Sequence, residues 1–388
     1  MNYFDIIIVG GGPAGSTCAL ALANSGLKVA VIEKASYPRG KVCGDAIAAY
    51  IPKVLHAIHP KYKKAFDDFA EKTEVNTCRV VAPNEKYIDI TSNESGFIIP
   101  RLQLDNFLYQ LSSSENNITW LLNLEITNVK IDTLLQEATV TAGNSVFKTK
   151  LLIGCDGALS IINKKLTGSL PDLKHYSGAV RAYYKNVTGI PDKTYELHFI
   201  KNVLPGYFWI FPLKDNRANV GLCIPSYAIS KHKINLRQTL EDIITNNPAI
   251  KTRFENATLF GKIEGYGLPL GSRKTVISGD HFMLCGDAAS LIDPATGEGI
   301  GQSMISGRYA GWQAIKCFAQ HNFSAAFMKQ YDKQLHDKLW SNFRKSYFLQ
   351  RYFFTKKWLF NSLANVVNKS KLVKKLVLRH FLKVADSK

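Results

Sequence analysis

The chain has 388 residues, of which 46% are hydrophobic and 21% charged, a composition typical of folded globular proteins rather than disordered or fibrous ones. Its seven cysteines are an odd number without any CxxC pair, which excludes a disulfide framework and CxxC-type metal sites. The formal net charge is +18, and no uncharged apolar run reaches the ~18–20 residues of a membrane-spanning helix. Reduced thiols are the simplest interpretation of the cysteines, and they predict a cytoplasmic protein.

The N-terminal segment has the pattern of a β-α-β unit of about thirty residues. Residues 4–9 are apolar and bounded by glycines, which predicts a strand buried on both faces of a parallel sheet. Residues 13–25 are rich in Ala and Leu and predict a helix closed by Gly26. Residues 28–32 predict a second buried strand, which ends at Glu33.

The middle of the chain changes character. Residues 77–90 and 178–224 contain short alternating stretches separated by Pro, Gly, Asn and Asp, which predict an antiparallel sheet. Residues 151–157 and 282–286 predict two further buried strands, each followed by a glycine turn. After about residue 330 the pattern becomes helical and basic, and no internal repeat is present.

The strongest single motif is GGGPAG at residues 10–15, a GxGxxG between a strand and a helix. Gly10 permits the tight turn, Gly12 lets the backbone approach a pyrophosphate, and Gly15 lets helix and strand pack closely. The helix N-terminus offers free N–H groups to the phosphates. Glu33, at the end of the second strand, is placed to accept a hydrogen bond from a ribose hydroxyl. These elements together predict a bound dinucleotide.

Downstream motifs identify the nucleotide as FAD by resemblance. The segments LCGDAA at 284–289 and DPATGEGIG at 293–301 resemble the flavoprotein monooxygenase superfamily of the p-hydroxybenzoate hydroxylase type. In that group the aspartate matched by Asp287 holds the ribityl chain of FAD, and the turn after it lies along the flavin ring. The segment CDGALS at 155–160 matches an internal Asp-Gly motif, and Arg101 matches a flavin-contacting arginine. The alternative that Asp287 only caps a helix explains that residue alone.

Within the superfamily the chain resembles the geranylgeranyl reductase family. The segment KVCGDA at 41–46 matches a family motif whose cysteine lies near the flavin, and YFWIFP at 207–212 matches the YxWxFP element. Two positions depart from the pattern: Cys223 stands where the family has the second glycine of a GxG, and Ala46 where many members have glycine. Both departures lie along the expected substrate cavity.

The resemblance implies two sets of site residues. It implies catalytic roles for Cys43, Tyr207 and Trp209. It implies FAD contacts at Gly10, Gly12, Ala14, Gly15, Glu33, Gly44, Ala46, Arg101, Ile126, Asp156, Asp287, Pro294, Gly297, Gly299 and Ile300.

These residues also have structural interpretations. Cys43 could be a buried small apolar residue, although Lys41 beside it would favour a reactive thiolate. Tyr207, Trp209 and Phe211 alternate along one strand and therefore share a face, which is either a packed core or an aromatic wall over the flavin. No metal site is expected, because His56 and His59, which are three residues apart, lack acidic or cysteine partners nearby.

The expected fold class is α/β (α+β), with three parts. A Rossmann-like FAD-binding domain is assembled from the discontinuous segments 1–75, 98–175 and 270–330. An inserted antiparallel-sheet domain, at 76–97 and 176–269, binds the substrate. The third part, 331–388, is a basic C-terminal helical region.

This C-terminal region carries +11 of the +18 net charge, from 14 Lys and Arg against 3 Asp and Glu. Its aromatic residues are interleaved with the basic ones, a combination suited to an anionic lipid interface. Such a contact would make the protein peripheral on the inner face of the membrane. The alternative is a helical pair that packs its aromatics on the body and leaves its charges in water. Nucleic acid is not expected as a partner, because the chain shows no readout motif.

The sequence predicts an FAD-dependent reductase of carbon–carbon double bonds in a long apolar, isoprenoid (geranylgeranyl-type) small-molecule or lipid substrate. Because no second strand–GxGxxG–helix unit is present, NAD(P)H or another reductant is expected to bind only transiently. One alternative is an FAD monooxygenase of an aromatic or carrier-bound substrate. A halogenase is disfavoured because halogenases carry WxWxIP where this chain has YFWIFP. A third alternative is a flavin-bearing membrane-surface protein without catalysis.

Overall fold

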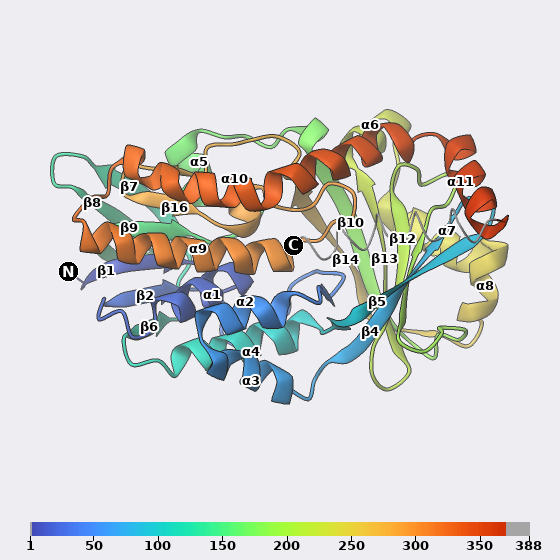
Figure 1. Cartoon of the computed structure of the whole chain (residues 1–388), viewed down its shortest axis with the longest axis horizontal. Coiled ribbons are helices and arrows are strands. Elements are labelled where there is room, and N and C mark those ends of the chain that lie inside the picture. Colours follow the sequence, from blue (N-terminus) through green and yellow to red (C-terminus); the bar gives the residue numbers. More distant parts are fainter. Residues whose placement is uncertain (1, 370–388) are drawn as a thin grey trace.

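Two eight-stranded sheets lie at opposite ends of the computed structural model, which describes residues 2–369 (Figure 1). Sheet A has the strand order β15-β16-β9-β1-β2-β6, with β7 and β8 attached beside β9. Its strands are β1 Asn2–Val9, β2 Val29–Ile32, β6 Ile118–Leu121, β7 Ile126–Asp132, β8 Glu137–Ala142, β9 Ser145–Gly154, β15 Ser278–Gly279 and β16 Phe282–Leu284.

Sheet B has the strand order β14-β10-β13-β12-β11-β4-β5-β3. Its strands are β3 Ala46–Ile47, β4 Thr73–Val81, β5 Tyr87–Ile98, β10 Tyr176–Lys185, β11 Thr194–His198, β12 Tyr207–Pro212, β13 Arg217–Pro225 and β14 Thr258–Pro269. The predicted antiparallel arrangement is found at every pairing except β4 with β11, which is parallel. These two strands come from distant segments and are not joined by a hairpin.

The helices surround the sheets and connect them. They are α1 Pro13–Leu22, α2 Ile51–Ile58, α3 Pro60–Asp68, α4 Arg101–Ser113, α5 Ile161–Thr167, α6 Ser226–His232, α7 Leu236–Asn246, α8 Pro248–Phe254, α9 Ile300–Ala319, α10 Ala325–Phe348 and α11 Lys357–Lys369. Short 3₁₀ turns span Leu173–His175 and Gly286–Ala289, and a π-helical turn spans Leu349–Phe353. None of the helices within residues 2–369 is long and apolar enough to span a membrane.

The predicted N-terminal β-α-β unit forms the centre of sheet A. Strand β1 lies between β9 and β2, parallel to both, and its residues Ile6–Ile8 are buried on both faces. Helix α1 ends at Leu22, three residues before the predicted end, because the backbone turns extended at Ala23. Helix α9 packs directly on α1, and a Cβ at Gly307 would lie 2.1 Å from the carbonyl oxygen of Ala14. The close contact therefore requires glycine.

The two faces of sheet B have different surroundings. On β12, Phe208 and Ile210 point into an apolar cluster with the helices α7 and α8. Tyr207, Trp209 and Phe211 point to the opposite face, as the alternation of the sequence predicts. This second face looks toward sheet A, and it forms one wall of the cavity described below.

The C-terminal helices α10 and α11 bury some of their side chains against the rest of the protein. Tyr331 of α10 is fully buried, and its hydroxyl donates to the carbonyl of Leu284 at 2.6 Å. Helix α11 buries Phe360 and Ala364 in the same cluster as Trp209. The predicted helical character of 331–388 is confirmed up to 369, and residues 370–388 lie outside the described part. Whether the three predicted parts fold as separate domains stays a prediction.

Candidate flavin and substrate site

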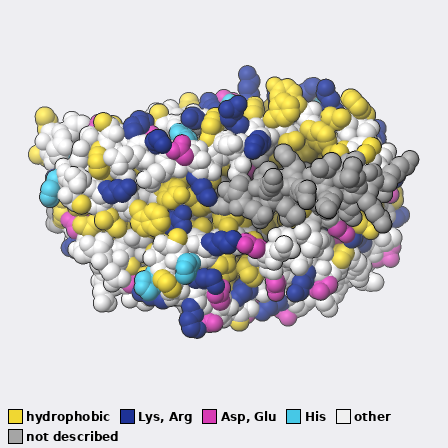
Figure 2. All heavy atoms as spheres, viewed as in Figure 1, with side chains coloured by type: hydrophobic (Ala, Val, Ile, Leu, Met, Phe, Trp, Pro, Cys, Tyr) yellow, Lys and Arg dark blue, Asp and Glu magenta, His cyan; other side chains and the backbone are white. Residues whose placement is uncertain are grey.

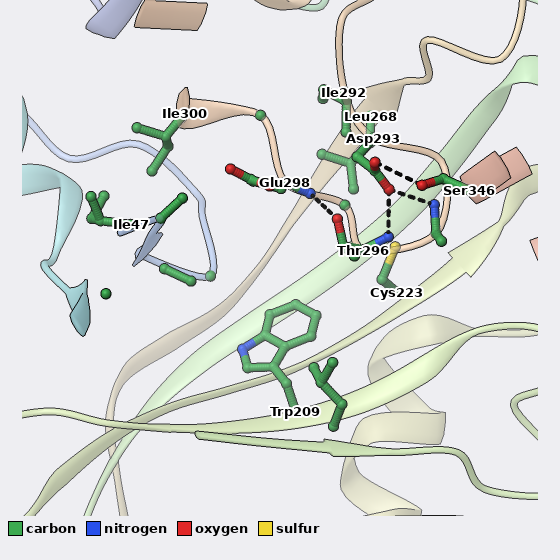
Figure 3. A pocket seen from close by; sticks show the side chains of 18 of the residues that line it. Ile47, Trp209, Cys223, Leu268, Ile292, Asp293, Thr296, Glu298, Ile300 and Ser346 are labelled. Carbon is green, nitrogen blue, oxygen red and sulfur yellow. Dashed lines mark hydrogen bonds between the residues drawn. The ribbon is translucent and has the colours of Figure 1, made fainter. Parts of the chain in front are cut away.

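A cavity of about 1880 Å³ lies between the glycine-rich turn after β1 and the inner face of sheet B. Ligand pockets of proteins typically measure ~300–1,000 Å³, so the cavity has room for two large ligands together. Its lining includes the segment 41–50, the inner face of β12, the loop 292–300 and parts of α10 and α11. Figure 3 shows the loop facing Trp209 across this space.

The glycine turn has the geometry that its motif predicts. Gly10 has φ +96°, and a Cβ there would lie 2.4 Å from the carbonyl oxygen of Cys155. A Cβ at Gly15 would lie 1.9 Å from the carbonyl oxygen of Gly10. At Gly12, by contrast, the nearest atoms to a Cβ are guanidinium nitrogens of Arg101 and Arg39, at 3.7 and 3.8 Å. Gly10 and Gly15 are thus required by the fold, while Gly12 leaves space beside α1.

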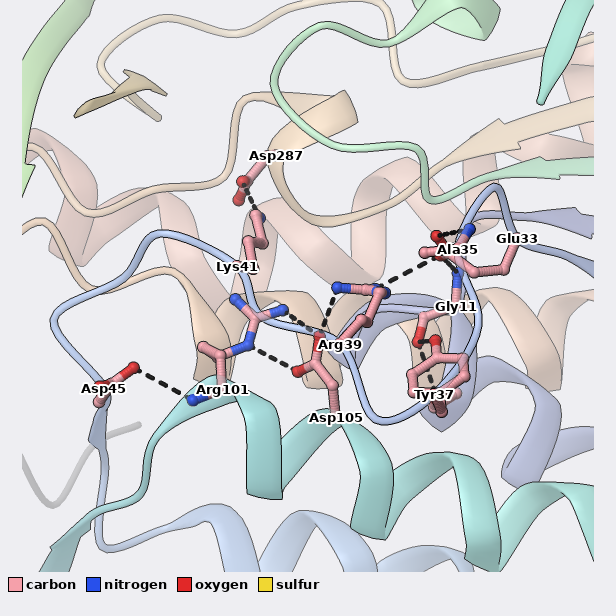
Figure 4. Close-up of polar contacts among 11 residues, drawn as sticks. Gly11, Glu33, Ala35, Tyr37, Arg39, Lys41, Asp45, Arg101, Asp105 and Asp287 are labelled. Atoms are coloured by element: carbon pink, nitrogen blue, oxygen red, sulfur yellow. Dashed lines mark hydrogen bonds and ion pairs between the residues drawn. The ribbon is translucent and has the colours of Figure 1, made fainter. Parts of the chain in front are cut away.

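Glu33 supports the glycine turn from behind. One carboxylate oxygen accepts a hydrogen bond from the Gly11 N–H at 2.8 Å, and the other accepts from the Ala35 N–H at 3.1 Å. The Tyr37 hydroxyl donates to the carbonyl of Gly11 at 2.5 Å (Figure 4). These bonds fix the turn before any ligand binds. The predicted role of Glu33 toward a ribose stays a prediction.

Two guanidinium groups meet beside Gly12. Arg101 makes a bidentate ion pair with Asp105, at 2.6 and 2.7 Å, and Arg39 contacts the same carboxylate at 3.0 Å (Figure 4). Burial lowers the pKa of Arg101, but Asp105 outweighs burial and raises it, so the group stays charged. Arg39 Nε is buried and has no partner among residues 2–369. The open space at Gly12 and this positive charge fit the pyrophosphate of a dinucleotide such as FAD.

Lys41 forms an ion pair with Asp287 at 3.1 Å, and both residues line the cavity (Figure 4). Its ammonium also lies 4.8 Å from the ring centre of Tyr266. As predicted, the Lys41 charge lowers the pKa of the Cys43 thiol, but this effect is smaller than that of burial. Burial is the main cause that raises the pKa of the Cys43 thiol, and it outweighs the nearby cations. Cys43 is therefore held as a thiol at neutral pH.

Cys43 lies in a turn that is bonded to the aromatic wall. Asn219 of β13 donates to the Cys43 carbonyl at 2.8 Å and accepts from the Trp209 indole N–H at 2.9 Å. A Cβ at Gly44 would lie 3.3 Å from the ring of Phe211, so a larger residue would press on the wall. The predicted residues Cys43, Gly44 and Trp209 thus lie together in the wall of the cavity.

Tyr207 connects the aromatic wall to the loop 292–300. Its hydroxyl donates to the carbonyl of Thr296. The loop is closed by Asp293, which accepts from the N–H groups of Ala295 and Thr296, each at 3.0 Å (Figure 3). Ser346 of α10 donates to the other oxygen of Asp293 at 2.9 Å. The loop is therefore held from both sheet B and α10.

The structure brings most of the predicted site residues to the cavity. Those that line it are Gly12, Ala14, Cys43, Gly44, Ala46, Arg101, Tyr207, Trp209, Asp287, Gly297, Gly299 and Ile300. Cys223, at the departure from the family pattern, also lines it, opposite Tyr207 in the sheet register.

The remaining predicted residues have other surroundings. Gly10, Gly15 and Glu33 shape the turn, and Pro294 lies in the loop 292–300 and accepts from Gln350. Asp156 lies before α5 and accepts from the hydroxyl of its N-cap residue Ser160 and from the Ile162 N–H, at 2.6 and 3.2 Å. Ile126 begins β7 and packs in the core of sheet A. Its predicted FAD contact has no support from this placement.

Several polar residues of the site were not predicted from the sequence. They are Arg39, Asp45, Asp105, Tyr183 and Asn219. Asp45 lies in the KVCGDA segment, so its motif was a usable signal, whereas the others have no local motif. Among residues 2–369, no cluster of His, Cys, Asp and Glu has the arrangement of a metal site.

Comparisons with known proteins give the following matches. The model of the FAD binding domain family matches residues 3–346. A digeranylgeranylglycerophospholipid reductase of Methanococcus vannielii is 30% identical over 348 residues, which cover 86% of this chain and 83% of the relative. One of Thermoplasma volcanium is 28% identical over 347 residues, with coverages of 87% and 84%.

Solved structures share the fold at lower identity. A geranylgeranyl bacteriochlorophyll reductase-like protein from Thermoplasma acidophilum has a TM-score of 0.82 and 22% identity, with 100% of this chain and 98% of that chain covered. The halogenase PltM, in complex with phloroglucinol and FAD, has a TM-score of 0.78 and 16% identity, with coverages of 99% and 84%. At these identities both show the fold alone.

Proposed function

Because the chain belongs to the FAD binding domain family and, within it, to the geranylgeranyl reductase family, we propose that it reduces carbon–carbon double bonds of a long isoprenoid lipid. The chain is an FAD-dependent oxidoreductase of this type. The observation that supports the substrate proposal is the cavity of about 1880 Å³, which extends beyond the glycine turn along the apolar face of sheet B. Since its relatives are digeranylgeranylglycerophospholipid reductases, we assign the substrate to geranylgeranyl-type chains.

The residues beside Gly12 would hold the cofactor. Arg39 and Arg101 would face the FAD pyrophosphate, together with the N-terminus of α1. Lys41 and Asp287 line the cavity on the other side and offer a cation and a carboxylate to the polar groups of the cofactor. When bound and reduced, FAD supplies the hydride for one carbon of the double bond.

Cys43 is the proposed proton donor for the other carbon. Its thiol keeps its proton because burial raises the pKa, and a general acid must be protonated before the reaction. The N–H of Asp45 donates to Cys43 Sγ at 3.3 Å, which holds the sulfur in one orientation. A neutral thiol fits this role better than the thiolate that the sequence suggested.

The aromatic wall and its neighbours would hold the isoprenoid chain and exclude water. Trp209 and Phe211 present neighbouring rings, with centres 5.9 Å apart and planes inclined by 28°, along the inner face of β12. The remaining apolar lining comes from β4, β11 and the C-terminal helices and includes Val75, Val80, Leu197, Phe199, Phe353 and Phe360. Burial of apolar surface contributes about 25 cal/mol per Å², so a long hydrocarbon chain would bind mainly through this term.

We further propose that the substrate enters from an anionic membrane surface. The cavity is lined at α10 and the following turn by Phe348 and Tyr352, which are 60% and 57% exposed, and Trp358 nearby is 66% exposed. No Asp or Glu occurs from residue 338 to 385, while Lys and Arg recur throughout this stretch. Figure 2 shows Lys and Arg side chains among apolar ones on one face of the molecule. Exposed aromatics beside basic groups suit a lipid interface.

The reductant is proposed to be NAD(P)H or another donor that visits the flavin transiently. Hydroxylation of an aromatic substrate and a non-catalytic flavin carrier are the alternatives, and one experiment separates them. The purified protein is reduced without oxygen and then mixed with a polyprenyl lipid or with oxygen. Rapid reoxidation by the lipid supports the reductase. Oxygen consumption that is stimulated by an added aromatic substrate, with a hydroxylated product, would replace the proposal with a monooxygenase. No turnover in either case would leave a carrier.

A further inference from the structure

Asp45 follows Cys43 by two residues, is fully buried and lines the cavity. Its backbone has φ +67°, in the left-handed region that few residues other than glycine adopt at low cost. A buried carboxyl group in such a conformation costs free energy twice, through desolvation and through backbone strain. The fold compensates these costs with specific contacts.

Three donors, from α4 and from the paired strands β10 and β13, reach the Asp45 carboxyl group. One oxygen accepts from the backbone N–H of Arg101, at the start of α4, at 3.2 Å. The other accepts from the Tyr183 hydroxyl of β10 at 2.6 Å and from the Asn219 side chain of β13 at 2.8 Å. The carboxyl group thus joins the start of α4 to two adjacent strands of sheet B.

Asn219 transmits this connection to the proposed reacting groups. Its NH₂ group donates to both the Asp45 carboxyl and the Cys43 carbonyl, and its oxygen accepts from the Trp209 indole. While these bonds are intact, the Asn219 amide and the Trp209 indole each keep one orientation. The network therefore fixes the thiol-bearing turn and the aromatic wall relative to one another.

We propose that Asp45 is a positioning residue, whose ionised carboxylate acts through Asn219 to hold Cys43 and Trp209 in the reactive arrangement. This rests on the proposed function, since Cys43 and Trp209 are assigned to that reaction. The carboxylate form suits this role because the Tyr183 and Asn219 side chains both donate to it, and such bonds are stronger to a charged acceptor. A protonated carboxyl group carries no charge and weakens both bonds.

The charged and titratable groups that face Asp45 come from α4, β10 and its own turn. Arg101 lies on α4, Arg181 and Tyr183 lie on β10, and Cys43 lies on the same turn. Burial raises the pKa of Asp45 to about 6, although the bonds from Tyr183 and Asn219 and the charges of the arginines lower it. The network consequently changes its protonation within the range of ordinary assays, and the carboxylate is lost as the pH falls below about 6.

The test measures alkene reduction by the FAD-loaded enzyme from pH 5 to 8.5. We expect the wild type to lose turnover below about pH 6, and Asp45→Asn to be about 10- to 100-fold slower in kcat, without this acidic limb. Tyr183→Phe removes one donor and keeps the ring, so we expect its acidic limb to move to higher pH while FAD stays bound. If turnover of both variants falls at the same acidic pH as turnover of the wild type, the proposal is overturned, because Asp45 then has a structural role only.

A second readout separates this proposal from the proposed function. The Asp45 charge contributes to the raised pKa of the Cys43 thiol, so Asp45→Asn should lower it. Alkylation of Cys43 by iodoacetamide, followed by peptide mass spectrometry against pH, measures this pKa without any substrate. If the wild type reduces no alkene but the alkylation midpoint falls in Asp45→Asn, the proposed function fails while the network stands. An unchanged midpoint contradicts the network directly.

Discussion

The glycine turn gives the sharpest test of the cofactor site, through Gly12→Val. The backbone at Gly12 has φ −71° and ψ −171°, which any residue adopts without strain. Its Cβ would meet nothing closer than 3.7 Å, so the protein itself has room for the side chain. The same space is where the FAD pyrophosphate would lie. Valine should therefore leave the folded apoprotein intact and remove FAD binding.

The expected loss of FAD affinity in Gly12→Val follows from the loss of contacts to the phosphates. A 100-fold weaker affinity corresponds to about 2.7 kcal/mol, and saturating FAD at 100 times its Kd stabilises the wild type by about the same amount. We expect FAD to raise the Tm of the wild type but not of Gly12→Val. Gly40→Val is the matched control, because a Cβ there meets nothing within 4 Å and its φ is not positive. If Gly12→Val keeps its yellow flavin at unchanged affinity, the reasoning about the turn is refuted.

Three further predictions concern the reaction, the stability and the membrane contact. Cys43→Ala should slow alkene reduction while FAD absorbance and affinity stay unchanged, and equal turnover in both proteins would return Cys43 to a structural role. Because the folded-state pKa of Asp45 is raised from 3.8 to about 6, its contribution to stability is present below pH 3.8 and is lost as the pH rises through about 6. Urea unfolding should show the wild type losing about 3 kcal/mol relative to Asp45→Asn between pH 3 and 7, and pH curves of the same shape for both proteins would contradict this. Replacing Phe348, Tyr352 and Trp358 by serine should weaken binding to anionic vesicles without releasing FAD. Added salt should also weaken the vesicle binding of the wild type, because the Debye length falls to ~8 Å at physiological ionic strength. Vesicle binding that is unaffected by the serine replacements and by salt would exclude this surface as the membrane contact.

The sequence predicts those parts of the fold that depend on local patterns. The β-α-β unit at residues 4–33 follows from apolar runs and glycines, and the inward face of β12 follows from the alternation of Tyr207, Trp209 and Phe211. Helix α9 and the close approach of its glycines to α1 could not be predicted in this way, because the contact joins distant segments.

The polar interior of the site depends on partners far apart in the chain. Lys41 and Asp287 are 246 residues apart, and Asp45 and Asn219 are 174 apart. The sequence assigned Lys41 to its neighbour Cys43, whereas the fold turns its ammonium toward Asp287 and buries the thiol. A neighbour in sequence is a poor guide to charge pairing in a buried site, since burial and long-range pairs decide the pKa.

The central claim is that this chain adds hydrogen to the double bonds of an isoprenoid lipid. The most direct measurement incubates the FAD-loaded protein with a geranylgeranyl-type lipid and a chemical reductant without oxygen, and then analyses the lipid by mass spectrometry. The account predicts that the lipid gains one H₂ for each double bond reduced and that Cys43→Ala forms this product more slowly. A lipid that is recovered unchanged, while an aromatic substrate gains oxygen in air, would contradict the account.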